Sequence, residues 1–163
     1  MENESYSHNI IATLCYVKKR DKVLMLHRVK KQNDIHQGKY NGLGGKLEKG
    51  ETPYECVIRE IKEESGLSIK NPVLKGILNF PNFDGKNNWI VFVYISDKFS
   101  GKLVKSEEGN LEWVGFKDIL NLPLWEGDKI FLKDVFKKNS FFYGTFYYRK
   151  NRLVKYKFQT IKK

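Results

Sequence analysis

Three carboxylates at the spacing i, i+3 and i+4 stand out in the sequence, namely Glu60, Glu63 and Glu64. On a helix they share one arc, where like charges at this spacing repel one another. Arg59 can pair with Glu51 or with a glutamate one helical turn away, but one guanidinium cannot neutralise the whole cluster. Carboxylate oxygens suit magnesium, which bridges phosphate oxygens and lowers the pKa of an attacking water. The pattern therefore predicts a metal site for phosphate chemistry.

An acidic, solvated helix face without a ligand is the alternative explanation of such a cluster. The glycine-rich loop at residues 41–45 favours the metal site, because glycine lets the backbone approach a ligand closely and small residues leave carbonyl groups free to bind a metal ion.

The helix that positions the carboxylates is predicted to begin after Thr52 and to end before Gly66. Thr52 and Glu55 form a capping-box pattern, and Pro53 suits the first helical turn. Gly66 can adopt the left-handed conformation that follows a helix end. The apolar residues of this segment share the neighbouring arc: Tyr54, Val57, Ile58 and Ile61. One side of the helix is therefore expected to pack, while the other presents carboxylates.

Residues 45–67 resemble the signature of the Nudix family, which reads G, five residues, E, seven residues, R-E-apolar, any residue, E-E, any residue, G-apolar, and every specified position is filled. Nudix enzymes hydrolyse a nucleoside diphosphate linked to another moiety, using water and magnesium or manganese. The resemblance implies metal binding by Glu60, Glu63, Glu64 and the Gly44 carbonyl, with Arg59 orienting the carboxylates.

A fourth carboxylate is expected from a later loop. Glu108 matches a glutamate that many members of the family supply there, and Glu107 is the one-residue alternative. Which glutamate acts as general base stays open, as does the number of metal ions.

Two further stretches, KYNGLGGKLEKGET and LPLWEGDKIF, resemble the 8-oxo-dGTP diphosphatases, which cleave oxidised purine triphosphates to the monophosphate and pyrophosphate. In that subfamily an asparagine before the glycine loop and acidic residues after a late tryptophan read the base edge. The matching positions are Asn41, Trp125 and Asp128. Vertebrate-type members carry two adjacent aspartates after the tryptophan, whereas this chain reads W-E-G-D. Either Glu126 substitutes, or selectivity rests on Asn41 and Asp128 alone.

Each base-reading assignment has a structural alternative: Asn41 as a turn residue, Trp125 as core and Asp128 as the cap of a helix at residues 129–137. The other residues expected around the substrate are Arg28, Gly45, Lys46 and Phe80. Residues 29–40 are polar and irregular, as in a rim over a site. His27 and His36 lack metal partners at ligand spacing and are expected to be structural or surface residues.

The predicted elements resemble the Nudix α/β/α sandwich, an α/β fold with a mixed central sheet, in one domain over residues 1–163. The strands are expected at residues 9–18, 22–28, 72–80, 89–95, 110–116, 141–149 and 153–159, and short helices at 116–122 and 129–137. Cys15 and Cys56 are expected to be buried, reduced thiols.

The chain has 30 Lys+Arg against 19 Asp+Glu, a net charge of +11, and should attract anions. Most of the excess lies late in the chain, without the base-reading motifs of a dedicated nucleic-acid module. A small nucleotide is therefore the expected partner, and RNA is less favoured. Neither a signal-peptide pattern nor an apolar run of transmembrane length appears, so the expected location is the cytoplasm, away from membranes.

The resemblance thus implies a nucleoside triphosphate pyrophosphohydrolase with Mg²⁺ or Mn²⁺ as cofactor, acting on 8-oxo-dGTP or related oxidised purine nucleotides. The alternative substrates are a dinucleoside polyphosphate, ADP-ribose and 5′-triphosphate RNA. A nucleotide-binding module without catalysis is the alternative outside enzymes.

Overall fold

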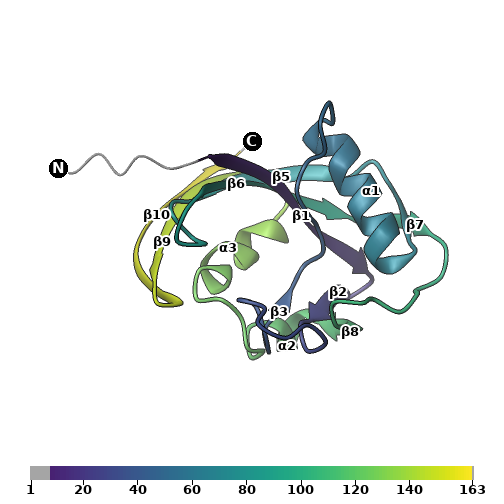
Figure 1. The fold of residues 1–163 in the computed structure, drawn as a ribbon. Coiled ribbons are helices and arrows are strands. Elements are labelled where there is room, and N and C mark those ends of the chain that lie inside the picture. The colour runs from purple at the N-terminus through teal and green to yellow at the C-terminus, as the bar shows by residue number, and fades with distance from the viewer. Residues whose placement is uncertain (1–7, 163) are drawn as a thin grey trace.

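A mixed β-sheet runs through the computed structural model, which describes residues 8–162 (Figure 1). Its strands are β1 (Asn9–Lys19), β2 (Lys22–His27), β3 (Tyr40–Asn41), β5 (Val73–Phe80), β6 (Asn88–Ser96), β8 (Asn110–Gly115), β9 (Ser140–Arg149) and β10 (Arg152–Lys162). The spatial order is β10-β9-β5-β6-β1-β2-β3, and β8 also pairs with β2. The β1–β6 and β5–β9 pairs are parallel, and the other pairs are antiparallel. A separate two-stranded sheet joins β4 (Ser68–Lys70) to β7 (Lys98–Ser100).

The helices are α1 (Pro53–Ser65), α2 (Phe116–Ile119) and α3 (Asp128–Val135). Side chains alternate across a strand, and β1 shows which helix covers each face. Tyr16 belongs to an apolar core that includes Phe131 of α3, whereas Cys15 belongs to a second core that includes Val57 and Ile61 of α1. The two helices therefore cover opposite faces of a mixed sheet, and the expected α/β architecture is confirmed.

The ends of α1 follow the predicted local signals. The Thr52 side chain accepts a hydrogen bond from the Glu55 backbone N–H, 3.2 Å between the atoms, and Pro53 lies in the first turn. Gly66 ends the helix with a left-handed φ of 82°. The prediction for this helix is confirmed at both ends, because its signals are all local.

The beginning of α3 differs from the prediction. The helix starts at Asp128, Gly127 occupies the N-cap position, and no side chain caps it. Gly127 already has helical backbone angles, and its carbonyl accepts hydrogen bonds from the N–H groups of Ile130 and Phe131. Asp128 is buried instead of capping, so its assignment as a helix cap is wrong. The helix ends at Val135.

Other element limits shift by small amounts. The α2 helix covers 116–119 instead of the expected 116–122, and the short strands β3, β4 and β7 were not expected. The terminal hairpin is confirmed, with positive φ angles at Lys150 and Asn151 in its turn. Cys15 and Cys56 are free and buried, as predicted. No helix within residues 8–162 is long and apolar enough to cross a membrane.

The glycine loop runs alongside β1. The Thr13 N–H donates to the Gly45 carbonyl at 2.8 Å, and the Cys15 N–H donates to the Leu43 carbonyl at 2.6 Å. Gly44 lies between these two contacts, where a Cβ atom would come within 1.9 Å of the Thr13 carbonyl oxygen. A side chain there would push the loop away from β1.

We expect Gly44→Ala to lower the free energy of unfolding by about 2 kcal/mol or more, because the added methyl group meets fixed backbone. Gly115→Ala is the control, since a Cβ there meets only the flexible Asp118 carboxyl at 3.3 Å. It should lose less than about 1 kcal/mol. Urea unfolding of both variants measures the difference, and equal losses would contradict the steric argument.

Candidate active site

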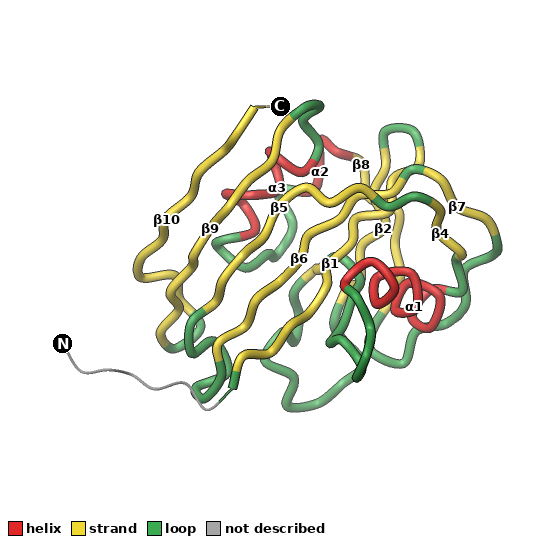
Figure 2. The backbone as a smooth tube through the Cα atoms, turned by 90° about the horizontal axis from the view of Figure 1, so that it is seen from above, coloured by secondary structure: helices red, strands yellow, loops and turns green. Residues whose placement is uncertain are grey.

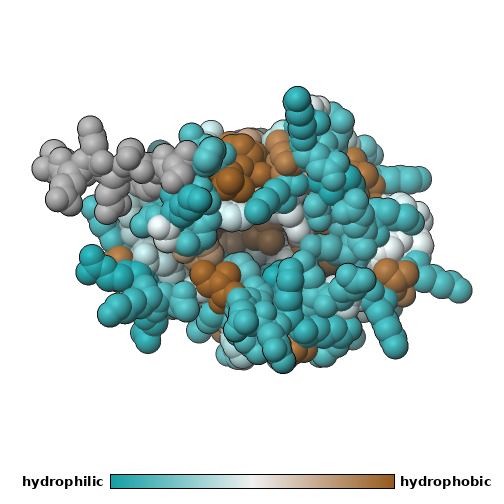
Figure 3. All heavy atoms as spheres, viewed as in Figure 1, coloured by the Kyte–Doolittle hydropathy of each residue, from teal (hydrophilic) through white to brown (hydrophobic). Residues whose placement is uncertain are grey.

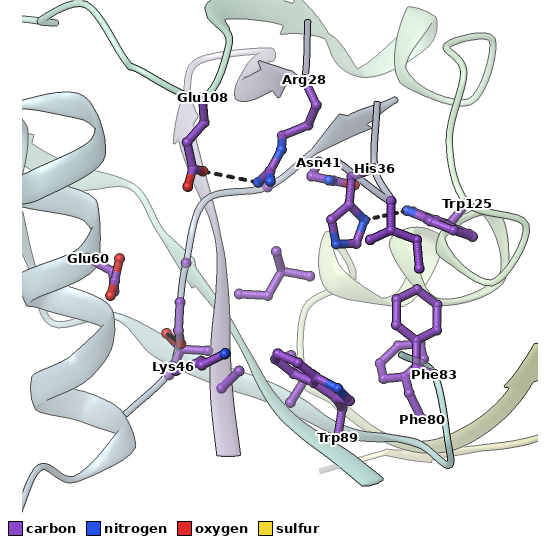
Figure 4. A pocket seen from close by; sticks show the side chains of 18 of the residues that line it. Arg28, His36, Asn41, Lys46, Glu60, Phe80, Phe83, Trp89, Glu108 and Trp125 are labelled. Carbon is purple, nitrogen blue, oxygen red and sulfur yellow. Dashed lines mark hydrogen bonds and ion pairs between the residues drawn. The ribbon is translucent and has the colours of Figure 1, made fainter. Parts of the chain in front are cut away.

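A cavity of about 630 Å³ lies between α1, the glycine loop and the α3 side of the sheet. A hollow with an apolar floor and hydrophilic walls is visible near the centre of Figure 3. Figure 4 shows that the cavity has two chemically different ends. Glu60 and Glu108 lie at one end, and Phe80, Phe83 and Trp125 lie at the other.

The carboxylates at the acidic end include Glu60 and Glu64 from α1 and Glu108 from the loop before β8, and the more exposed Glu48 also lines the cavity. The Gly44 backbone N–H donates to Glu64 Oε2 at 3.2 Å, which fixes this carboxylate against the glycine loop. A Cβ at Gly45 would lie 2.4 Å from the Glu60 carboxyl carbon, so glycine leaves the space that Glu60 occupies.

Two acidic residues next to this cluster, Glu107 and Glu63, lie outside the cavity lining. Glu107 is exposed and is not part of the cavity lining, whereas Glu108 is half-buried in it. Glu63 is also absent from the lining, and its side chain is 57% exposed. The structure therefore brings Glu60, Glu64 and Glu108 together and leaves Glu63 at the outer edge of the cluster.

Arg59 ties the helix to the glycine loop. Its guanidinium binds Glu51, donates to Glu60 Oε1 at 2.8 Å and to Glu63 Oε2 at 3.1 Å, and reaches the Lys46 carbonyl at 3.2 Å. Hydrogen bonding to this guanidinium lowers the pKa of Glu51 to about 2. Arg59 therefore holds Glu60 in one orientation, which is the arrangement that an orienting residue needs.

The acidic end carries more negative charge than its arginines neutralise. Burial raises the pKa of Glu64 to about 8, and the charges of Glu108 and Glu60 add to this effect. Burial also raises the pKa of Glu60. Arg28 binds Glu108 Oε2 at 3.1 Å but shares its guanidinium with Asp34 at 2.8 Å. A cation placed among these carboxylates would relieve their repulsion.

Within residues 8–162, no three acidic, histidine or cysteine side chains converge closely enough to hold a metal ion as they stand. The residues nevertheless fit magnesium, because this ion prefers hard carboxylate oxygens as ligands. Glu60, Glu64 and Glu108 supply such oxygens in one cavity, beside the glycine loop.

Aromatic rings form the opposite end. The Phe80 ring stacks on Phe146, with 5.8 Å between ring centres, and Phe83 lies 5.1 Å from Trp125 and 5.4 Å from Tyr148. Such a surface suits the flat face of a purine.

Trp89 closes the lower side of the cavity in Figure 4, and the Lys46 ammonium lies 5.3 Å from the centre of its ring. Lys46 therefore stands between the aromatic wall and the acidic end, where it can meet a phosphate.

His36 is a cavity residue that the sequence interpretation missed. Trp125 Nε1 donates to His36 Nδ1 at 2.8 Å, and the two side chains face each other in Figure 4. Burial, together with the charge of Arg28, lowers the pKa of His36 to about 4, so its ring is neutral near pH 7. His36 and Trp125 are 89 residues apart, and no local pattern links them. The irregular segment at residues 29–40 does form part of the rim, as expected.

Asn41 and Asp128 are the polar residues near the aromatic end. Asn41 lies on β3 opposite Leu26, and Asp128 is 9% exposed at the start of α3. Burial raises the pKa of Asp128 to about 7, partly offset by the positive charge of Lys39.

Glu126 is directed elsewhere. It accepts hydrogen bonds from Arg152 Nε at 2.8 Å and from the Leu153 N–H at 3.2 Å, and it does not line the cavity. Asn41 and Asp128, in contrast, both line the cavity.

Most of the expected site residues meet in this one cavity. Those that line it are Arg28, Asn41, Gly44, Gly45, Lys46, Arg59, Glu60, Glu64, Phe80, Glu108, Trp125 and Asp128. Glu63 is the exception.

Relatives with different named activities are similar in sequence to this chain. The Bacillus subtilis (strain 168) uncharacterized Nudix hydrolase YvcI is 39% identical over 140 residues, 83% of this chain and 85% of that protein. The ADP-ribose pyrophosphatase of Methanocaldococcus jannaschii is 35% identical over 118 residues, 72% of this chain and 67% of that protein. The oxidized purine nucleoside triphosphate hydrolase of Mus musculus is 30% identical over 111 residues, 68% of this chain and 71% of that protein.

The crystal structure of the mutator MutT protein from Bacillus halodurans superposes with a TM-score of 0.82 and 36% identity, covering 91% of this chain and 97% of that one. The family model of the NUDIX domain matches residues 8–135, which include α1, the glycine loop and Glu108. The resemblance seen in the signature at residues 45–67 is thereby confirmed, and the chain belongs to the Nudix hydrolase family.

Proposed function

We propose that this Nudix protein hydrolyses 8-oxo-dGTP or related oxidised purine triphosphates to the monophosphate and pyrophosphate, with a divalent metal ion. The main observation in support of this function is a single cavity with carboxylates at one end and aromatic rings at the other, where the buried acid Asp128 also lines the wall. The mouse relative, an oxidized purine nucleoside triphosphate hydrolase, supports this substrate class. The Methanocaldococcus jannaschii relative makes ADP-ribose the second candidate.

At the acidic end, Glu60, Glu64 and Glu108 would hold magnesium, with the Gly44 carbonyl beside them and Glu63 at the edge of the cluster. When bound, the metal supplies charge neutralisation for the phosphates and a lowered pKa for water. The carbonyls of Leu43 and Gly45 are bonded to β1, on either side of Gly44.

The chain itself positions the reactants and moves a proton. Arg59 keeps Glu60 in place, and one of the cavity carboxylates accepts a proton from the water that attacks the β-phosphorus. The bond between that phosphorus and the oxygen of the α-phosphate breaks, which releases the monophosphate and pyrophosphate. Arg28 and Lys46 reach toward the phosphates from the two sides of the cavity.

At the aromatic end, the base lies among Phe80, Phe83 and Trp125, and His36 holds the indole of Trp125 in one orientation. An 8-oxopurine differs from a purine by a carbonyl at C8 and an N–H at N7. The Asn41 amide offers both a donor and an acceptor, and a buried acid with a pKa of about 7 donates in its protonated form and accepts in its ionised form. These two residues therefore suit the recognition of an oxidised base edge.

The substrate assignment is tested by release of pyrophosphate and monophosphate with magnesium, comparing 8-oxo-dGTP, dGTP, ADP-ribose and a dinucleoside polyphosphate. We expect kcat/KM for 8-oxo-dGTP to exceed that for dGTP at least about tenfold, roughly 1.4 kcal/mol of transition-state discrimination. Chelation of the metal should abolish turnover. Preference for ADP-ribose would assign the cavity to the second candidate, and no turnover on any compound would favour a binding module.

Glu64→Gln should lower kcat by about a thousandfold or more, because it removes a charged oxygen ligand from the buried cluster while keeping the side-chain volume. Glu107→Gln is the matched control, since this exposed glutamate lies next to Glu108 but outside the cavity. It should retain turnover. Circular dichroism checks that both variants are folded, and near-normal turnover of Glu64→Gln would reject the assignment.

Asp128 should make stability fall with rising pH. Its pKa in the folded protein, about 7, lies above the ordinary value of 3.8, so the folded state binds more protons between these values. Asp128→Asn lacks this titration. The difference in unfolding free energy between Asp128→Asn and the unmodified protein should therefore shift by roughly 2 kcal/mol in favour of the variant when the pH is raised from 5 to 8.

Urea unfolding at the two pH values measures this gain. Asp97→Asn, at an exposed position, is the control for the loss of one aspartate side-chain carboxyl. A constant offset between Asp128→Asn and the unmodified protein at both pH values would show that Asp128 ionises normally.

A further inference from the structure

The last part of the chain is strongly basic and lies beyond the family match. Nine lysine and arginine residues follow Asp134, and no aspartate or glutamate does. This region contains β9 and β10, whereas the NUDIX domain model ends at residue 135. β9 contributes Tyr148 to the cavity, but the side of the hairpin that faces away from α3 contributes no lining residue among those described.

One face of the hairpin belongs to the protein core. Phe142, Phe146 and Phe158 point toward α3, where the Phe131 ring lies 5.9 Å from Phe142. Because side chains alternate along a strand, the residues between them point to the opposite face. On that face Tyr143 lies opposite Gln159, Thr145 opposite Lys157, and Tyr147 opposite Lys155. We call these six residues the outer hairpin face.

The outer hairpin face is open. Figure 2 looks onto this side of the sheet, where α1 lies over the β1 end and away from β9 and β10. Tyr143 is 46% exposed, and Lys155 and Lys157 are exposed. The Lys155 ammonium lies 5.7 Å from the centre of the Tyr147 ring, so a cation and an aromatic ring sit side by side.

Open sheet faces that carry aromatic rings and lysines have the chemistry of single-stranded nucleic acid binding. Unpaired bases stack on aromatic rings, and the phosphates between them attract lysine. A second copy of this chain fits less well, because it would bring Lys155 and Lys157 against the same cations. We propose that the outer hairpin face binds single-stranded nucleic acid, with Tyr143 and Tyr147 stacking on bases and Lys155 and Lys157 contacting phosphates.

Fluorescence anisotropy tests this directly with labelled single strands of RNA and DNA, about 12 nucleotides long and ending in a 5′-hydroxyl, in the presence of a chelator. Chelation and the 5′-hydroxyl keep the probe from being hydrolysed at the cavity. We expect binding that weakens steeply between about 50 and 200 mM salt. Excess 8-oxo-dGTP should not displace the strand, because the cavity lies on the other side of the sheet. Binding of RNA alone, or of RNA and DNA equally, supports the proposal.

Matched variants locate the binding. Lys155→Gln with Lys157→Gln should weaken binding at least about fivefold and reduce the salt slope by about 1.4, or about 0.7 for each lost phosphate contact. The control pair is Lys70→Gln with Lys98→Gln, which removes two exposed lysines that face each other on β4 and β7. The control should change affinity less than about twofold.

A second pair of variants tests the stacking of bases on the tyrosine ring. Tyr143→Ala should weaken binding at least about fivefold, whereas Tyr54→Ala, which removes a ring of similar exposure (44%) on α1, should not. All variants should keep their thermal stability and their turnover of nucleotide, since none lies in the cavity.

Three results would overturn the proposal: no binding of either strand, equal losses in test and control pairs, or displacement by 8-oxo-dGTP. Light scattering gives a further decisive result. A dimer that Tyr143→Ala dissociates, without any nucleic-acid binding, would assign the face to a second copy of the chain.

Discussion

The backbone pairing between the glycine loop and β1 is the contact on which the site depends. It holds Gly44 and Gly45 where no side chain fits, one against the backbone of β1 and the other against the Glu60 carboxyl. The same segment begins at Asn41, near the aromatic end. One short stretch of backbone therefore sets the distance between the part of the cavity that suits phosphate chemistry and the part that suits a base.

Electrostatic interactions then determine which carboxylates of the acidic end favour their ionised form. Hydrogen bonds from Arg59 favour the ionised form of Glu51, whereas burial and neighbouring carboxylates disfavour the ionised form of Glu64. Arg28 divides its charge between Asp34 and Glu108. Such a cluster costs free energy of folding in the absence of a cation, and a protein retains it where function requires it.

How far the sequence predicts the structure depends on the range of the interactions. Both ends of α1 follow from Thr52, Pro53 and Gly66, because a cap involves residues within one turn. Asp128 was misassigned as a cap because its burial results from packing between α3 and distant strands. The position of His36 in the cavity has no local sequence signal, since its partner Trp125 lies 89 residues later in the chain.

The parallel pairing of β5 with β9 has a consequence for folding. Gly76 must meet Phe142, so a large loop has to close before these strands pair. Contacts of such long range form slowly, because the entropy of loop closure is lost before any contact compensates for it. Since β9 also supplies Tyr148 to the cavity, we expect the aromatic end of the cavity to form last during folding, after α1 and its carboxylates are already in place.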